Sequence, residues 1–184
     1  MTDKPLYEER VSSLWTEALF AALAIVFFVL LIWRIGAASP DILSVAFFLL
    51  FAFFLFYTLN YRTLIIRLTP ESLKLKFGIF SWTIPLDNVA ECHLDHVPVL
   101  MRYGGAGIHF MFIRKRYRAS FNFLEHPRVL IAFRRKEGLV RDISFSTRRP
   151  DDMIRRIQEA VSAKRAAHHE RPADSPSTPL HASG

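Results

Sequence analysis

The chain contains one cysteine, and two of its long stretches contain no charged residue. A single cysteine, Cys92, excludes a disulfide within the chain and is typical of a reducing compartment. The uncharged stretches run from Ala18 to Trp33 and from Ile42 to Tyr61. They exclude an ordinary soluble globular protein, because a chain of 184 residues cannot surround two helices that are apolar on all sides.

The sequence also lacks the short motifs of common catalytic sites. It has no nucleophile elbow, no metalloprotease motif and no dinucleotide fingerprint. On a strand, Cys92 and His96 would share one face while His93 and Asp95 share the other, so these four groups would not meet at one metal ion. We therefore expect no enzyme activity, no metal site and no cofactor.

The two apolar stretches predict a transmembrane hairpin. We expect helices over residues 14–35 and 42–61, joined by an external turn at residues 36–41, because about 20 helical residues span the roughly 30 Å hydrocarbon layer. Trp15, Trp33 and two tyrosines at the ends of these stretches are typical of interfacial aromatic belts. The alternatives are two buried core helices, or a signal peptide cleaved near Gly36.

Positive charges near the helix ends predict the orientation. Lys4 and Arg10 precede the first helix and Arg62 follows the second, whereas the connecting turn has no lysine or arginine. We expect both termini to be cytoplasmic and the protein to lie in the inner (plasma) membrane, with residues 1–13 as a cytoplasmic tail. Glu17 is interpreted as a headgroup-level residue, the alternative being an ion or proton site.

Residues 62–164 change to the pattern of a β domain. Leu73, Leu75 and Phe77 alternate with Lys74 and Lys76, as in a half-buried strand. About seven such strands predict a mainly antiparallel barrel or sandwich. Pro150 begins an amphipathic helix that would close the barrel, and residues 165–184 are predicted to be a disordered tail.

Four segments of this domain together resemble a known family. They are Leu-Thr-Pro-Glu-Ser-Leu-Lys-Leu-Lys-Phe-Gly at 68–78, Ile-Pro-Leu-Asp-Asn-Val at 84–89, Arg-Tyr-Gly-Gly-Ala-Gly-Ile at 102–108 and Ile-Ser-Phe-Ser-Thr-Arg-Arg-Pro-Asp-Asp at 143–152. In this order, after a membrane hairpin, they resemble the bacterial membrane-anchored PH-like (pleckstrin-homology-like) domain family. The resemblance implies an adaptor or oligomerisation module, and it brings no catalytic residues.

Basic residues are the candidate binding groups. Residues 62–164 contain 19 Lys and Arg against 10 Asp and Glu, a net charge of +9. Beside a membrane, such charge favours anionic lipid headgroups over nucleic acid, although a solvated basic loop is the alternative. The candidate lipid- or anion-contact residues are Arg114, Lys115, Arg116, Arg118, Arg134, Arg135 and Lys136. A phosphate-binding role for the glycines at 104–107 is less favoured than a simple bend.

The sequence therefore predicts a non-enzymatic module that presents a basic cytoplasmic domain to a protein partner, a second copy or anionic headgroups. The alternative is a small accessory subunit of a transporter or envelope-assembly complex, in which Glu17 or Asn60 would lie at a helix interface.

Overall fold

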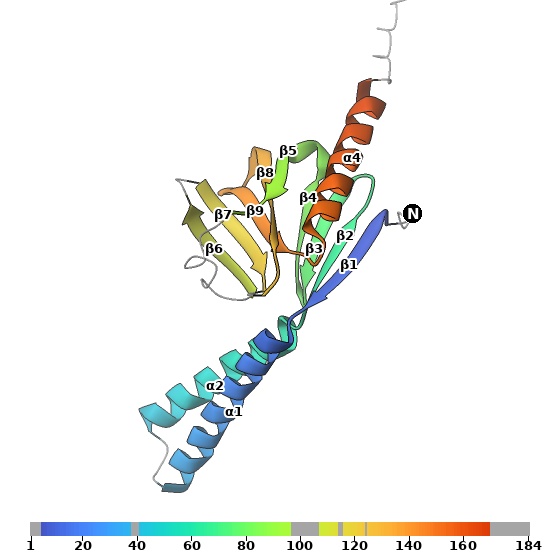
Figure 1. Cartoon of the computed structure of the whole chain (residues 1–184). Coiled ribbons are helices and arrows are strands. Elements are labelled where there is room, and N and C mark those ends of the chain that lie inside the picture. The colour runs from blue at the N-terminus through green and yellow to red at the C-terminus, as the bar shows by residue number, and fades with distance from the viewer. Residues whose placement is uncertain (1–4, 38–40, 97–106, 114–115, 124, 170–184) are drawn as a thin grey trace, which may run out of the picture.

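A computed structural model describes residues 5–37, 41–96, 107–113, 116–123 and 125–169. Two helices form a hairpin that projects from one end of a β domain (Figure 1). The order of elements is β1 (Tyr7–Ser12), α1 (Leu14–Ala37), α2 (Ile42–Asn60), β2 (Thr63–Leu68), β3 (Ser72–Phe77), β4 (Phe80–Pro85), the 3-10 turn η1 (Leu86–Asn88), β5 (Val89–Leu94), β6 (Gly107–Ile113), β7 (Arg116–Asn122), β8 (Arg128–Glu137), β9 (Val140–Ser146) and α4 (Pro150–His169).

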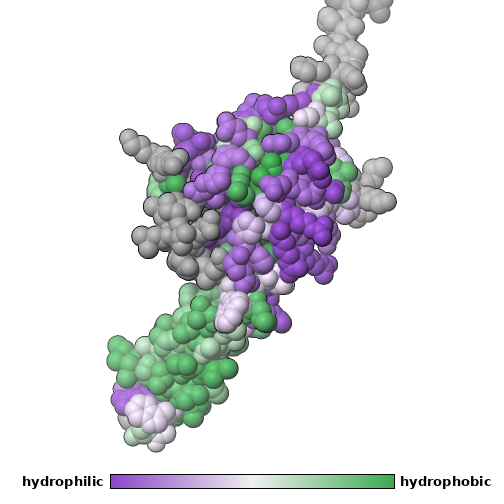
Figure 2. Space-filling view, viewed as in Figure 1, coloured by the Kyte–Doolittle hydropathy of each residue, from purple (hydrophilic) through white to green (hydrophobic). Residues whose placement is uncertain are grey.

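The helices α1 and α2 are long and apolar enough to cross a membrane, and their bounds follow the predicted ones closely. In the most apolar stretch of each helix, only 6 % of the residues are buried. This exposure excludes the alternative of two core helices. Aromatic rings join the helices to each other, for example Phe27 to Phe54 at 5.5 Å between centroids. Figure 2 shows the resulting apolar surface, which covers the hairpin between its more polar tip and the polar β domain.

The first sheet has the order β1-β2-β3-β4 and is antiparallel throughout. Its strand β1 lies where we expected a tail at residues 1–13. The strand pairs with β2 over its whole length, with Ser12 opposite Thr63 and Tyr7 opposite Leu68. The helical hairpin is therefore inserted between two neighbouring strands of one sheet. We call the end of the sheet at Ser12 and Thr63 the hairpin end.

The second sheet has the order β5-β8-β9-β7-β6. All of its pairs are antiparallel except β7 and β9, which run parallel. The two sheets are not closed on each other, so of the two predicted alternatives the barrel is wrong, and two open sheets packed on one core agree with the sandwich. The described residues form nine strands rather than about seven, and one of them, β1, lies outside the β domain expected at residues 62–164.

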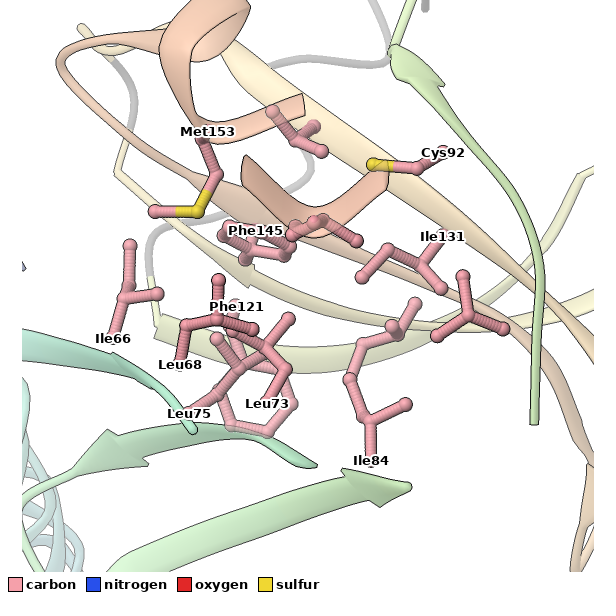
Figure 3. Close-up of a cluster of buried hydrophobic side chains, with 14 of the residues drawn as sticks. Ile66, Leu68, Leu73, Leu75, Ile84, Cys92, Phe121, Ile131, Phe145 and Met153 are labelled. Carbon is pink, nitrogen blue, oxygen red and sulfur yellow. The ribbon is translucent and has the colours of Figure 1, made fainter. Parts of the chain in front are cut away.

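The core lies between the sheets and is completed by α4. Figure 3 shows side chains from both sheets, among them Leu75, Phe121 and Phe145, in one cluster with Met153 of α4. These four side chains are at most 2 % exposed. The amphipathic stripe predicted for the C-terminal helix is confirmed, but the helix continues to His169, beyond the predicted domain end at residue 164.

Candidate functional site: a basic end of the second sheet

Strand order brings two basic segments that are distant in sequence to one end of the second sheet. The strand β9 begins at Val140 and lies between β7, which begins at Arg116, and β8, which ends at Glu137. Because β7 is parallel to β9 and β8 is antiparallel to it, the start of β7 and the end of β8 lie at the same end of the sheet, on either side of the start of β9. We call this the basic end. The candidates Arg114 and Lys115 precede β7 directly and lie outside the described residues.

Three exposed candidates lie on the last residues of β8. Arg134 donates a hydrogen bond from Nε to the carbonyl of Val89 at 3.1 Å, and the Arg135 backbone N–H donates to Oδ1 of Asn88 at 2.8 Å. The first contact holds the Arg134 guanidinium against the start of β5, the second holds the backbone at Arg135, and all three basic side chains remain exposed. Within the described part of the chain, neither arginine nor Lys136 forms an ion pair with a carboxylate. A shallow cleft of about 330 Å³ separates Arg134 and Arg135 from Asp87.

Arg118 has a different role, because its side chain is buried. Its Nη1 donates to both carboxylate oxygens of Asp95, at 3.0 and 3.1 Å, and Ser144 donates to the same carboxylate at 2.9 Å. The residue is 7 % exposed and cannot reach a lipid surface. Removing a charge from such a buried pair costs about 3–5 kcal/mol, so Arg118 stabilises the sheet rather than the basic surface.

Arg116 is exposed, like the arginines of β8, but it also pairs with a buried carboxylate, like Arg118. It pairs with Asp142 at 3.1 Å. Burial raises the pKa of the Asp142 carboxyl, while Arg116 and Arg118 act against that increase. Arg116 therefore both neutralises a buried carboxyl and contributes to the basic end.

Sequence reasoning missed Arg141. It is exposed at the start of β9, next to the ends of β7 and β8. A single arginine in an alternating strand does not indicate a binding site from sequence. Only the pairing of β9 with β7 and β8 places Arg141 beside Arg116 and the basic residues at the end of β8. Glu137 is the carboxylate nearest in sequence to Lys136, but it accepts hydrogen bonds from Nε1 of Trp82 at 2.7 Å and from Asn88 at 3.0 Å.

The cysteine, metal and glycine candidates form no site among the described residues. Burial raises the pKa of the Cys92 thiol to about 12, which does not suit a nucleophile at neutral pH. Among the described residues, no three His, Cys, Asp or Glu side chains are grouped as metal ligands would be. Of the glycines at 104–107, only Gly107 lies within the described residues.

The two polar groups proposed to lie at a helix interface are engaged within the chain. Glu17 pairs with Arg62 at 2.8 Å, at the hairpin end where α1 begins and α2 has just ended. This position agrees with the headgroup-level interpretation. The side chain of Asn60 donates to the carbonyl of Phe56 at 3.0 Å.

Comparisons with family models, with curated proteins and with solved structures find no match to this chain.

Proposed function

We propose that this protein is a non-enzymatic, membrane-anchored module that holds a basic β domain at a fixed orientation on the cytoplasmic face of the inner membrane. The observation that carries the proposal is the insertion of the helical hairpin between β1 and β2. Ser13 alone separates β1 from α1, and two residues separate α2 from β2. With both connections this short and the strands paired, the domain cannot swing away from the bilayer as it would on a flexible linker.

The ligand of such a module is acidic. Arg134, Arg135 and Lys136 present three charges at the basic end, with Arg116 and Arg141 beside them. The other ends of the strands of this second sheet are the ones at the hairpin end, where Gly107 of β6 lies against the ring of Tyr61 and His126, just before β8, contacts the carbonyl of Ser12. Attraction of a basic residue to an anionic membrane surface, about 1 kcal/mol, decays over a Debye length of about 8 Å at physiological salt, so the distance of the basic end from the hairpin end favours an acidic protein surface. Anionic lipid headgroups and an acidic protein surface are the two ligand classes that this chemistry accepts.

The fold also supports the proposed resemblance to PH-like domains. Without the β6–β7 hairpin, the domain consists of β1–β4, of the antiparallel set β5, β8 and β9, and of one C-terminal helix. These seven antiparallel strands and one helix agree in number with the expected set, although β1 lies outside residues 62–164, where all the strands were expected. We propose that β6 and β7 are an insertion into it.

Flotation with liposomes tests the ligand. The β domain, with residues 13–62 replaced by a two-residue turn, is mixed with neutral or anionic vesicles at low and high salt. Lipid contact predicts flotation with anionic vesicles only, weakened by salt and by R134E/R135E/K136E. A control, K74E/R155E, reverses two exposed charges, on β3 and on α4, away from both the basic end and the hairpin end.

Absence of flotation at low salt would reject lipid contact. An acidic protein would then be the remaining ligand class. A photo-crosslinking residue at position 135 of the full chain, in native membranes, identifies it by the mass of the crosslinked product. If position 135 yields neither a lipid nor a protein adduct, the basic end has no ligand and the proposal fails.

A further inference from the structure

The turn between β3 and β4 exposes apolar side chains. Ile79 is 72 % exposed and Phe80 is 40 % exposed. The other turn of this sheet formed by neighbouring strands, between β2 and β3, carries Pro70 and Glu71, and the Glu71 side chain is 68 % exposed. Two turns at opposite ends of one sheet therefore have opposite chemistry, which indicates that they face different surroundings.

Contacts fix the apolar turn to the end of α2. The ring of Phe80 stacks on Tyr61 at 6.1 Å and meets Phe56 edge-on at 6.3 Å. A Cβ atom at Gly78 would lie 2.6 Å from the carbonyl oxygen of Asn60, so the turn backbone touches the last helical residue. Ile79 is thereby held beside the helix end.

The length of α2 sets the depth of this turn in a bilayer. Its 19 residues span about 28 Å, slightly less than the hydrocarbon thickness of about 30 Å. The end of the helix at Asn60 therefore lies at the hydrocarbon boundary, and the interfacial layer continues for about 5–7 Å beyond it. Exposed cations, Arg62 and Lys76, flank the apolar turn, as expected for side chains at headgroup level.

We propose that residues 78–80 form a membrane-contact site that inserts Ile79 and Phe80 into the interfacial lipid layer and thereby sets the tilt of the domain. The inference rests on the proposed membrane anchoring by α1 and α2. Lipid is the occupant because the turn continues the apolar surface of the hairpin, which reaches the base of the domain in Figure 2. The hairpin and this turn form three points of contact, so the domain is prevented from rocking about the hairpin axis.

Spin-label accessibility in the full chain tests this site. In a Cys92→Ala background reconstituted into phosphatidylcholine–phosphatidylglycerol vesicles, nitroxide labels are attached at Ile79→Cys, Leu6→Cys and Val29→Cys. Leu6, which is 53 % exposed, directly precedes β1 at the opposite end of the same sheet, and Val29 is 58 % exposed within α1. Collision rates with oxygen, which partitions into lipid, are compared with those of a water-soluble nickel chelate.

The label at position 79 is expected to collide more with oxygen than with the nickel chelate, as the label at position 29 does, and the label at position 6 is expected to show the reverse. If position 79 behaves like position 6 while position 29 is in lipid, the turn faces water and this inference is overturned. Protection of position 79 from both reagents would overturn it in favour of a protein cover. A water-exposed label at position 29 would instead overturn the anchoring itself.

Discussion

At the scale of single residues, glycines in the β3–β4 and β8–β9 turns differ in their surroundings. Substituting them distinguishes the cost of a left-handed backbone from the cost of a steric clash. Gly78 and Gly138 both have positive φ, +51° and +62°, and each is followed by an exposed aliphatic residue. A Cβ at Gly78 would collide with Asn60, whereas at Gly138 it would meet nothing within 4 Å. Gly138→Ala should cost only the left-handed strain of about 1–2 kcal/mol, a decrease of about 2–8 °C in the melting temperature.

Gly78→Ala adds the collision with a backbone oxygen and should decrease the melting temperature at least twice as much. The measurement is the thermal unfolding of both variants in the same detergent, followed by tryptophan fluorescence. Equal shifts would show that the β3–β4 turn is not held against α2.

Asp142 predicts a pH dependence of stability that can be isolated by one substitution. Its pKa is raised in the folded state, chiefly by burial, so the folded protein binds this proton more tightly than the unfolded chain does. The free energy of unfolding therefore decreases as pH rises from about 3.8 through the raised pKa, by about 1.4 kcal/mol for each unit of increase. Asp142→Asn removes this proton.

The free energy of unfolding of Asp142→Asn, relative to the wild type, should therefore increase across that pH window and then level off. Denaturant unfolding in detergent at several pH values measures it, and Asp87→Asn, at an exposed position, serves as the control. A relative stability that falls with pH would mean that Arg116 and Arg118 outweigh burial.

At the scale of whole elements, the sequence predicts what depends on local pattern and fails where pairing decides. The apolar runs predict α1 and α2, and alternation predicts β3, because each pattern lies within one element. The strand β1 was missed because Tyr-Glu-Glu-Arg-Val-Ser contains one strongly apolar residue directed inward, Val11, and its pairing partner β2 follows 50 residues later. Local patterns also left barrel and sandwich as alternatives, because the choice between them depends on the order of strands.

The candidate site was predictable in composition but not in assembly. Arg114–Arg118 and Arg134–Lys136 are visible as charge runs. The parallel pairing of β7 with β9 brings Arg116 to the same sheet end as Arg134–Lys136. The burial of Arg118 depends on Asp95, which lies 23 residues earlier in the chain. Neither relation has a local signal.

The pairing of β1 with β2 predicts that the helical hairpin can be removed as a unit. Ser12 and Thr63 are antiparallel partners, so an Asn-Gly turn can connect them in place of residues 13–62. This variant should be soluble and folded, because the domain has its own core between the two sheets. A variant that begins at Thr63 should aggregate, because it lacks Val11, which is fully buried, and leaves the edge of β2 unpaired.

Circular dichroism and size-exclusion chromatography compare these two variants. Val11→Ser within the first variant is an intermediate case, since it keeps the strand pairing and removes only the apolar contact. If the chain beginning at Thr63 is as soluble and cooperative as the chain with β1, the first strand is dispensable and the hairpin is not an insertion in the folding sense.

For the whole molecule, strand pairing determines topology independently of charge. Because β1 precedes α1 and pairs with β2 after α2, the N-terminal strand and the β domain must lie on the same side of any membrane that the hairpin crosses. Charge then selects the side. Arg34, the one basic residue of the described chain near the connecting turn, forms an ion pair with Asp41, so that end of the hairpin carries no net positive charge from this pair.

Cysteine labelling in sealed vesicles tests this topology. In the Cys92→Ala background, Leu6→Cys and Leu139→Cys should react with a membrane-impermeant maleimide in inside-out vesicles only. Ile42→Cys, which is 88 % exposed at the first residue of α2, should react in right-side-out vesicles only. If positions 6 and 139 reacted from opposite sides, β1 and β2 could not be paired in the membrane. If both reacted from outside, the strand pairing would stand and the charge argument would fail.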